Sequence, residues 1–325
     1  MFEQTAIGVH EKLTVTLLKL IVRQSANFIS AFAFSRRLNS LQPTHSGFGK
    51  TAAFIRMMRI PNCIMIGFAV IVGEAIASQT VPANAAFYGF MTGFLLLAAS
   101  MVINDYFDRE IDAVNQPNRP IPSGIVKPGE AISFAIILVS LGLLFAAYSG
   151  TWTLLIAILS VATMLLYNSR AKKLGRPGNA LVSANVAVPF IYGGFAVGSP
   201  TWSLIIFASL AFISSMGREI MKGIVDVPGD TAKSVKSVAA TLGSNRAARE
   251  SAAFFLTAVV LSGLPIMMGL VSQYYVPLVT ICDAGFLLTA YSISTDASPR
   301  NAKRNKNFVL AWMTFGLLAF VIGIL

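Results

Sequence analysis

Nine apolar stretches, each about as long as the roughly twenty residues that a helix needs to cross a bilayer, constrain the fold of this chain more than any other feature. Over 325 residues the chain is 55% hydrophobic and only 12% charged, which excludes a soluble globular domain of this length. The expected spans lie at about 55–78, 84–105, 130–149, 151–168, 179–198, 201–221, 251–272, 275–293 and 307–325. The sequence therefore predicts an all-α polytopic membrane protein, with about nine transmembrane helices around a central cavity.

The Lys and Arg residues lie in alternate connections between these spans. They precede or open the first span and follow the second, fourth, sixth and eighth, whereas the short turns near Thr80, Gly150, Pro200 and Gln273 contain none. Cytoplasmic loops of membrane proteins hold the excess of Lys and Arg. We therefore expect the N-terminus inside, the C-terminus outside, and the cavity open to the cytoplasmic side of the cell membrane.

Residues 1–50 differ in composition from the rest of the chain. An apolar stretch within them, 13–34, is interrupted by two basic and two amide side chains and is too polar for a span. We expect residues 1–50 to form an N-terminal leader, either an interfacial amphipathic helix or a disordered segment, and residues 51–325 to form the transmembrane domain. Both histidines, His10 and His45, lie in the leader, so no histidine is expected as a base in the spans.

The net charge of +11 indicates an anionic partner. The basic residues are spread over several loops and interleaved with carboxylates, which argues against nucleic acid and favours membrane lipid headgroups or a diphosphate. The two cysteines, Cys63 and Cys282, both lie within expected spans. Neither a disulfide framework nor a zinc site is expected from them.

Two acidic clusters follow the second and the sixth span. They consist of Asn104, Asp105, Asp108 and Asp112 in the first cluster, and of Asp226 and Asp230 in the second. Spacings of three, four and seven residues place the members of each cluster on one helix face. Carboxylates so arranged repel one another unless a cation lies among them, and Mg²⁺ prefers oxygen ligands together with substrate phosphates. The clusters therefore predict a shared metal site, the alternative being two solvated helix ends that nearby basic residues balance.

A proline-rich loop follows the first cluster and could cover a polar pocket. Cluster and loop together, over 104–124, read N-D-x-x-D-x-x-x-D and then N-x-P-x-R-P-I-x-S-G. This pattern resembles the UbiA superfamily of intramembrane prenyltransferases, and every residue of both motifs is present. The resemblance extends from about Phe54 to the C-terminus: 59–62 reads Arg-Ile-Pro-Asn, 167–173 resembles the family's Tyr/Lys loop, and 218–230 resembles its second acidic motif.

The resemblance implies transfer of a prenyl group from its diphosphate to a lipophilic acceptor, with two Mg²⁺ ions bound beside that diphosphate. The implied metal ligands are Asn104, Asp108, Asp112, Asp226 and Asp230, which together with Lys172 form the catalytic set. The implied substrate-binding residues are Arg59, Asn62, Asp105, Arg119, Tyr167, Lys173, Arg218, Lys222 and Lys236. Of all these, Tyr167, Lys172 and Arg119 would hold the diphosphate. The cations available to a phosphate on the acceptor are Arg59, Arg218, Lys222 and Lys236.

Within the superfamily, the run Arg-Glu-Ile-Met-Lys at 218–222 is most similar to archaeal digeranylgeranylglyceryl phosphate synthases. These enzymes transfer a geranylgeranyl group to the free hydroxyl of geranylgeranylglyceryl phosphate in ether-lipid synthesis. Chlorophyll and bacteriochlorophyll synthases, which share the loop at 119–124, and aromatic prenyltransferases of quinone synthesis are alternatives. A cation-coupled secondary transporter is the alternative from a different class, although its acidic residues would be expected near the bilayer midplane. Two departures from the family pattern are Gly223, where many relatives have Asp, and Ser-Val-Ala at 237–239, where relatives have Thr-Leu-Pro.

Two ionisable residues lie inside expected spans. We expect structural roles for both, with Glu74 reaching water near the outer end of its span and Asp283 hydrogen-bonded to a neighbouring helix. An isoprenoid chain would need a long apolar tunnel. The aromatic candidates for its wall include Phe68, Phe90, Phe94, Phe190 and Phe195.

Overall fold

The computed structural model describes residues 47–78, 80–232 and 234–324, and every regular element in them is a helix. The elements are α2 (Gly47–Met58), α3 (Ile60–Ala77), α4 (Ala83–Asn115), α5 (Pro128–Ser149), α6 (Thr151–Ser169), η1 (Ala171–Leu174), α7 (Arg176–Ala196), α8 (Ser203–Ala232), α9 (Val238–Leu242), α10 (Ser244–Leu261), α11 (Leu264–Met267), α12 (Tyr275–Thr295) and α13 (Pro299–Gly323). Within these ranges, nine helical segments are long and apolar enough to cross a membrane. The expectation of an all-α polytopic membrane protein is confirmed.

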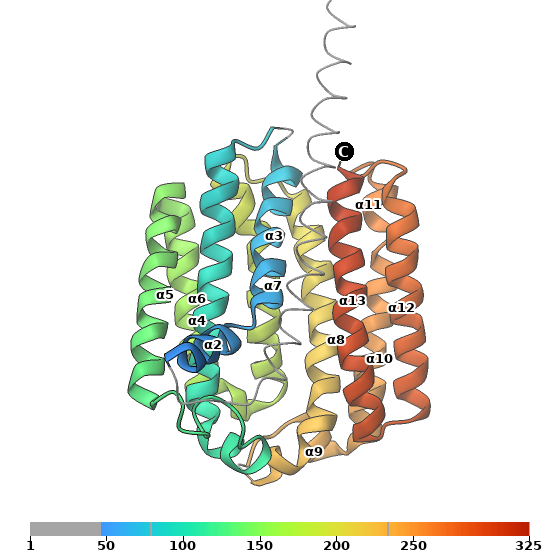
Figure 1. Cartoon of the computed structure of the whole chain (residues 1–325). Coiled ribbons are helices and arrows are strands. Elements are labelled where there is room, and N and C mark those ends of the chain that lie inside the picture. Colours follow the sequence, from blue (N-terminus) through green and yellow to red (C-terminus); the bar gives the residue numbers. More distant parts are fainter. Residues whose placement is uncertain (1–46, 79, 233, 325) are drawn as a thin grey trace, which may run out of the picture.

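The long helices follow one another around a closed ring (Figure 1). Each packs against the next in the order α3, α4, α5, α6, α7, α8, α10, α12 and α13, and α13 returns to contact α3. Additional contacts of α3 with α7 and of α8 with α13 cross the ring. The short helices α9 and η1 join the long ones near the end of the bundle at which α4 and α8 terminate, which is the lower end in Figure 1 and which we call the polar end.

The first expected span, 55–78, is not one continuous helix, so this expectation was wrong in detail. Arg59 has φ 55° and ψ 57°, a left-handed conformation that interrupts the helix between α2 and α3. Pro61 then occupies the first turn of α3, where its missing N–H costs no hydrogen bond. The proposed leader boundary at residue 50 falls inside α2, and residues 1–46 of the leader lie outside the described part of the chain.

Helices α4 and α8 are longer than their expected spans. With 33 and 30 residues they extend about 50 Å and 45 Å at 1.5 Å per residue, whereas the apolar core of a bilayer is about 30 Å thick. Both acidic clusters lie in the last turns of these two helices. The extra length therefore carries the clusters to the same end of the bundle.

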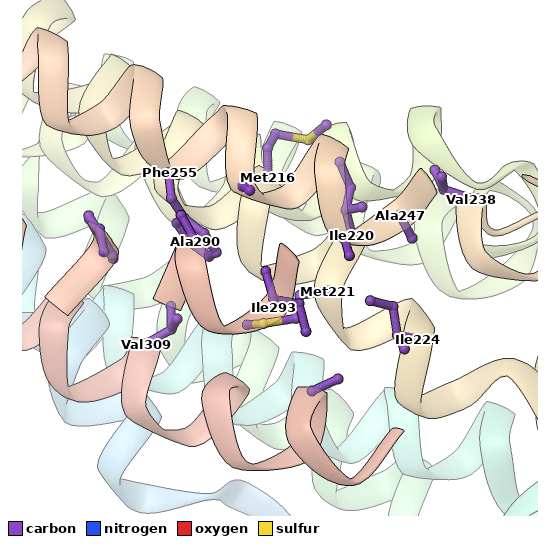
Figure 2. Packing of buried hydrophobic residues seen from close by; sticks show 14 of the residues in the cluster. Met216, Ile220, Met221, Ile224, Val238, Ala247, Phe255, Ala290, Ile293 and Val309 are labelled. Atoms are coloured by element: carbon purple, nitrogen blue, oxygen red, sulfur yellow. The ribbon is translucent and has the colours of Figure 1, made fainter. Parts of the chain in front are cut away.

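The rotation of α8 about its axis is fixed by an apolar cluster on one of its faces. Figure 2 shows Met216, Ile220 and Ile224 packed beside Phe255 of α10 and Ile293 of α12, and all five side chains are buried. Successive residues of a helix turn by about 100°. Burial of this face therefore directs the polar residues of the same helix turns away from α10 and α12.

A cavity of about 80 Å³ lies inside the ring between α3, α7, α8, α10, α12 and α13. Its lining is mostly apolar, and of the five phenylalanines proposed for a tunnel wall only Phe190 belongs to it. Asp283 also lines the cavity and accepts a hydrogen bond of 2.7 Å from the hydroxyl of Ser262, the C-cap residue of α10. The expected hydrogen bond of Asp283 to a neighbouring helix is confirmed.

The expectation that Glu74 reaches water was wrong. Its side chain is fully buried, and neither carboxylate oxygen has a hydrogen-bond partner among the described residues. The cause is the close approach of the neighbouring helices at glycines. A Cβ atom on Gly89 of α4 would collide with the Glu74 carboxylate, and one on Gly193 of α7 would collide with the backbone of Val70 and Glu74.

We predict that Gly193→Leu destabilises the protein by about 1–3 kcal/mol, because the new side chain must push α3 and α7 apart. The measurement is the midpoint of thermal unfolding in detergent. Gly129→Ala is the matched control, because Gly129 lies in the first turn of α5 with nothing within 4 Å of an added Cβ atom. Equal midpoints for wild type and Gly193→Leu would contradict the close packing of α3 on α7.

Candidate active site

The first acidic cluster lies on one face of α4 and is held by basic side chains from other segments. Asp108 accepts hydrogen bonds of 2.6 Å at both carboxylate oxygens from Nζ of Lys172, which belongs to η1. The amide nitrogen of Asn104 donates to Asp108 Oδ2 at 2.9 Å. Asn104 therefore uses its nitrogen on the neighbouring carboxylate, and its amide oxygen stays available to a cation.

The other two carboxylates of α4 share the guanidinium group of Arg119. Nη1 of Arg119 lies 2.5 Å from Asp112 Oδ2 and 3.3 Å from Asp105 Oδ1. Asp105 Oδ1 also accepts a hydrogen bond of 2.8 Å from Nη2 of Arg59, at the break between α2 and α3. Because Asp105 and Asp112 are both buried, these ion pairs are shielded from solvent and neutralise charges that would otherwise be costly.

The proline-rich loop positions Arg119 through its own hydrogen bonds. The N–H of Ser123 donates to the carbonyl of Arg119, and the N–H of Val126 donates to that of Pro120. Ile121, with Val126, is buried in the apolar cluster that α4 and α5 share. The loop is therefore anchored to the bundle, as a rigid cover over a polar site requires.

Residues of both acidic clusters lie near Tyr167 at the end of α6. The half-buried Tyr167 lies within electrostatic range of Asp108 on α4 and of Lys222 and Asp230 on α8. Asp230 in turn lies within range of Lys172, the lysine that holds Asp108. The two clusters, which are more than a hundred residues apart in the sequence, thus meet at the polar end of the bundle.

Some of the candidate residues lie at the edge of this meeting point. Lys173 and Lys236 have exposed side chains, and their contact is a backbone hydrogen bond of 3.0 Å from the Lys236 N–H to the Lys173 carbonyl. This bond ties the segment before α9 to η1. Asp226 is exposed, and Asn62 is half-buried in the first turn of α3.

The structure also adds two residues that the sequence analysis did not single out. Glu219 is buried on α8 and accepts hydrogen bonds from Arg218 at 2.9 Å and from Lys222 at 3.2 Å. Lys306 on α13 lies within electrostatic range of Lys222 and Asp226. The sequence signal for Lys306 was weak, because it directly precedes the expected ninth span and looked like one of several loop cations.

The donor set fits Mg²⁺ that is held together with a diphosphate. In the described part of the chain no three His, Cys, Asp or Glu side chains gather around one point, so a cage made of protein ligands alone is not formed. Mg²⁺ usually takes only one or two carboxylates and completes its coordination with water and substrate phosphates. Asn104, Asp108 and Asp112 on α4 and Asp226 and Asp230 on α8 provide that kind of set.

Packing does not require a glycine at position 223. A Cβ atom on Gly223 would lie 3.6 Å from Cβ of Ser237, which is an ordinary van der Waals contact. The backbone here would thus accept a larger residue. The absence of a carboxylate at 223 leaves the second cluster with Asp226 and Asp230.

Comparison with known proteins identifies the family of this chain. Residues 66–321 match the sequence model of the UbiA prenyltransferase family, so the chain belongs to this family. The protein is therefore a multi-pass membrane enzyme that transfers prenyl groups.

Two curated relatives with similar sequences are both named digeranylgeranylglyceryl phosphate synthase. The digeranylgeranylglyceryl phosphate synthase of Korarchaeum cryptofilum is 33% identical over 275 residues, which cover 84% of this chain and 98% of the relative. The synthase of the same name from Methanopyrus kandleri is 35% identical over 273 residues, covering 84% and 99%.

Solved structures show the same fold. A structure of a digeranylgeranylglyceryl phosphate synthase superposes with a TM-score of 0.68 at 31% identity, covering 85% of this chain and 98% of that chain. A UbiA homologue from Archaeoglobus fulgidus, bound to GPP and Mg²⁺, superposes with a TM-score of 0.60 at 16% identity and covers 83% of this chain and 99% of its own. The likeness to this second structure shows the fold alone.

We predict that Arg119→Ala lowers the rate of prenyl transfer about 100-fold, the usual effect of removing one preorganised donor from an active site. The variant leaves Asp112 without its basic partner and Asp105 with Arg59 alone. The measurement is the rate of transfer of a radiolabelled prenyl group.

Arg109→Ala is the matched control for this variant. The Arg109 guanidinium lies 4.6 Å from the ring centre of Tyr106 and pairs with Glu110, away from the carboxylates that Arg119 contacts. Similar losses in both variants would show that the general positive charge of this region matters, and not the contacts of Arg119.

Proposed function

We propose that the protein transfers a geranylgeranyl group from its diphosphate to the free hydroxyl of geranylgeranylglyceryl phosphate, as in archaeal ether-lipid synthesis. The reaction depends on Mg²⁺, and the active site faces the cytoplasm at the cell membrane, with the N-terminus inside and the C-terminus outside. The observation that carries this proposal is that Lys172, which pairs with Asp108 of the first acidic cluster, and Tyr167 both lie near Asp230 of the second. The names of the curated relatives support the choice of substrates.

The ion pairs at the polar end suggest how the diphosphate binds. Asp105, Asp108 and Asp112 are matched by three basic side chains in the protein as it stands. When bound, Mg²⁺ supplies charge neutralisation of the departing diphosphate. Lys172 and Arg119 are the two basic side chains that can then turn from the carboxylates to the phosphate oxygens, with the phenol of Tyr167 beside them.

The proposed reaction replaces one C–O bond of the allylic carbon by another. The allylic C–O bond of the donor breaks, the acceptor oxygen forms a new C–O bond to the same carbon, and the diphosphate leaves. Cations fixed in advance around the leaving group stabilise its developing charge. The acceptor hydroxyl gives up its proton as the ether forms, and the departing diphosphate is an acceptor for it.

The cavity inside the ring suits the isoprenoid chain. Ser214 lines it, and Asp226 lies twelve residues further along α8, which is about 18 Å at the helical rise. We infer that a donor with its diphosphate at the polar end directs its apolar chain along α8 toward this cavity. Phe190 and Phe286 are aromatic walls on opposite helices, α7 and α12.

We predict that Asp108→Asn and Asp226→Asn each lower transfer at least about 100-fold and raise the Mg²⁺ concentration needed for half-maximal rate. Each change removes one negative ligand and keeps the shape of the side chain. The measurement is a Mg²⁺ titration of the transfer rate, with the folded fraction checked by gel filtration in detergent.

Glu110→Gln is the control for these variants, because this carboxylate lies on α4 next to the cluster but has a side chain that is 73% exposed. Near-normal rates and an unchanged Mg²⁺ requirement in either Asp variant would contradict a metal site shared by the two clusters.

The choice of acceptor is tested by offering purified protein geranylgeranyl diphosphate with geranylgeranylglyceryl phosphate, chlorophyllide and aromatic acids in parallel, with and without Mg²⁺. Of the three acceptors, we predict that only geranylgeranylglyceryl phosphate gives product, and only in the presence of Mg²⁺. Product from chlorophyllide or an aromatic acid, but not from the glycerol phosphate, would contradict the proposed acceptor. Cation flux into vesicles without any transfer product would support a transporter instead.

A further inference from the structure

Helices α8 and α13 pack together, and near the polar end they carry a second group of basic side chains. The group consists of Arg218, Lys222 and Lys306, and we call it the α8–α13 basic group. In the part of the chain that the structure describes, none of its members forms a hydrogen bond or ion pair with the carboxylates of α4. It is therefore distinct from the basic residues that hold the first acidic cluster.

One buried carboxylate organises two members of this group. Glu219 Oε1 accepts from Nη1 of Arg218 at 2.9 Å, and Glu219 Oε2 accepts from Nζ of Lys222 at 3.2 Å. The Glu219 side chain is only 6% exposed. Its two oxygens are thus both used to hold the two cations on one side of α8.

The third member, Lys306, adds a positive charge that is not paired with a carboxylate in the described part of the chain. It is half-buried and lies within electrostatic range of Arg218 and Lys222, and within the described part of the chain it forms no hydrogen bond or ion pair of its own. Nε of Arg218 is also buried without a partner there. Like charges brought together away from water repel one another, and a buried donor without a partner is costly, so this group is suited to receive an anion.

Along α8 the group begins before the second acidic cluster and ends beside it. Arg218 lies eight residues before Asp226, about 12 Å closer to the apolar core at the helical rise. Lys222, one turn before Asp226, lies within range of both Asp226 and Tyr167. The group therefore lies between the second acidic cluster and the more apolar part of α8.

We propose that the α8–α13 basic group binds the phosphate monoester of the lipid acceptor, while Lys172 and Arg119 serve the donor diphosphate. Lys306 is the residue that completes this second anionic subsite. The inference rests on the proposed function, because the subsite has a role only if the acceptor carries a phosphate. Glu219 is a positioning residue in this subsite, since it acts through Arg218 and Lys222.

The test combines a change in the protein with a change in the acceptor. Full-length wild type and Lys306→Ala, in nanodiscs of zwitterionic lipid, are given geranylgeranylglyceryl phosphate or geranylgeranylglycerol, which differs only by the missing phosphate. We expect Lys306→Ala to raise the KM for the phosphate-bearing acceptor roughly 10- to 100-fold, the usual effect of losing one charged hydrogen bond. The KM for the donor and the rates with geranylgeranylglycerol should match those of wild type.

Two further variants make the result specific. Lys306→Arg keeps the charge and should restore most of the affinity for the phosphate-bearing acceptor. Arg300→Ala removes an exposed cation from the first turn of the same helix and should leave all constants unchanged. Repeating the kinetics in anionic nanodiscs distinguishes the acceptor's phosphate from bulk lipid headgroups, because headgroup binding would make the effect of Lys306→Ala depend on the lipid and not on the acceptor.

Several outcomes would overturn the inference. An unchanged acceptor KM in Lys306→Ala would do so, as would an equal loss with both acceptors, which indicates a structural role. A raised KM for the donor alone would assign the group to the diphosphate. Failure of the wild type to use geranylgeranylglyceryl phosphate, with activity on another acceptor, would contradict the proposed function itself and is thereby distinguished from failure of the inference.

Discussion

The structure at the polar end depends on the neutralisation of three carboxylates on one face of α4. Asp105 and Asp112 are buried and Asp108 is half-buried, and like charges this close at a membrane edge repel unless cations lie among them. The cations come from the start of α3, the proline-rich loop and η1. Basic side chains from three separate segments therefore pair with the carboxylates of one helix.

This requirement gives a reason for irregular backbone in these segments. Arg59 adopts a left-handed conformation, which costs a residue with a side chain on the order of 1–3 kcal/mol, and the break it creates is where its guanidinium reaches Asp105. Gly175, with φ 71°, ends η1 where a Cβ atom would collide with the backbone of Lys236. The ordinary helices provide the bundle, and the irregular residues place the charges.

The sequence was sufficient to predict the spans and to place both acidic clusters at helix ends, because hydropathy over about twenty residues and charge spacing of three or four residues are local signals. It did not predict the break at Arg59, because nothing in a continuous apolar pattern shows that a guanidinium must reach α4. The burial of Glu74 was equally invisible, since it follows from glycines on α4 and α7 that only the packed bundle brings together. Lys306 was missed for the same reason: its neighbours on α8 lie more than eighty residues earlier in the chain.

The balance of charge differs between the two sides of the site. On α4 three carboxylates face three basic side chains, so this side carries no excess charge with which to meet a diphosphate, and added Mg²⁺ would be needed there. Between α8 and α13, three basic side chains share the single carboxylate Glu219, with Asp226 one turn beyond. An excess of positive charge allows a phosphate monoester to bind without a metal ion. On the proposed assignments, one bundle thus separates two phosphorylated lipids by giving the donor a site that is complete only with metal and the acceptor a site built from side chains.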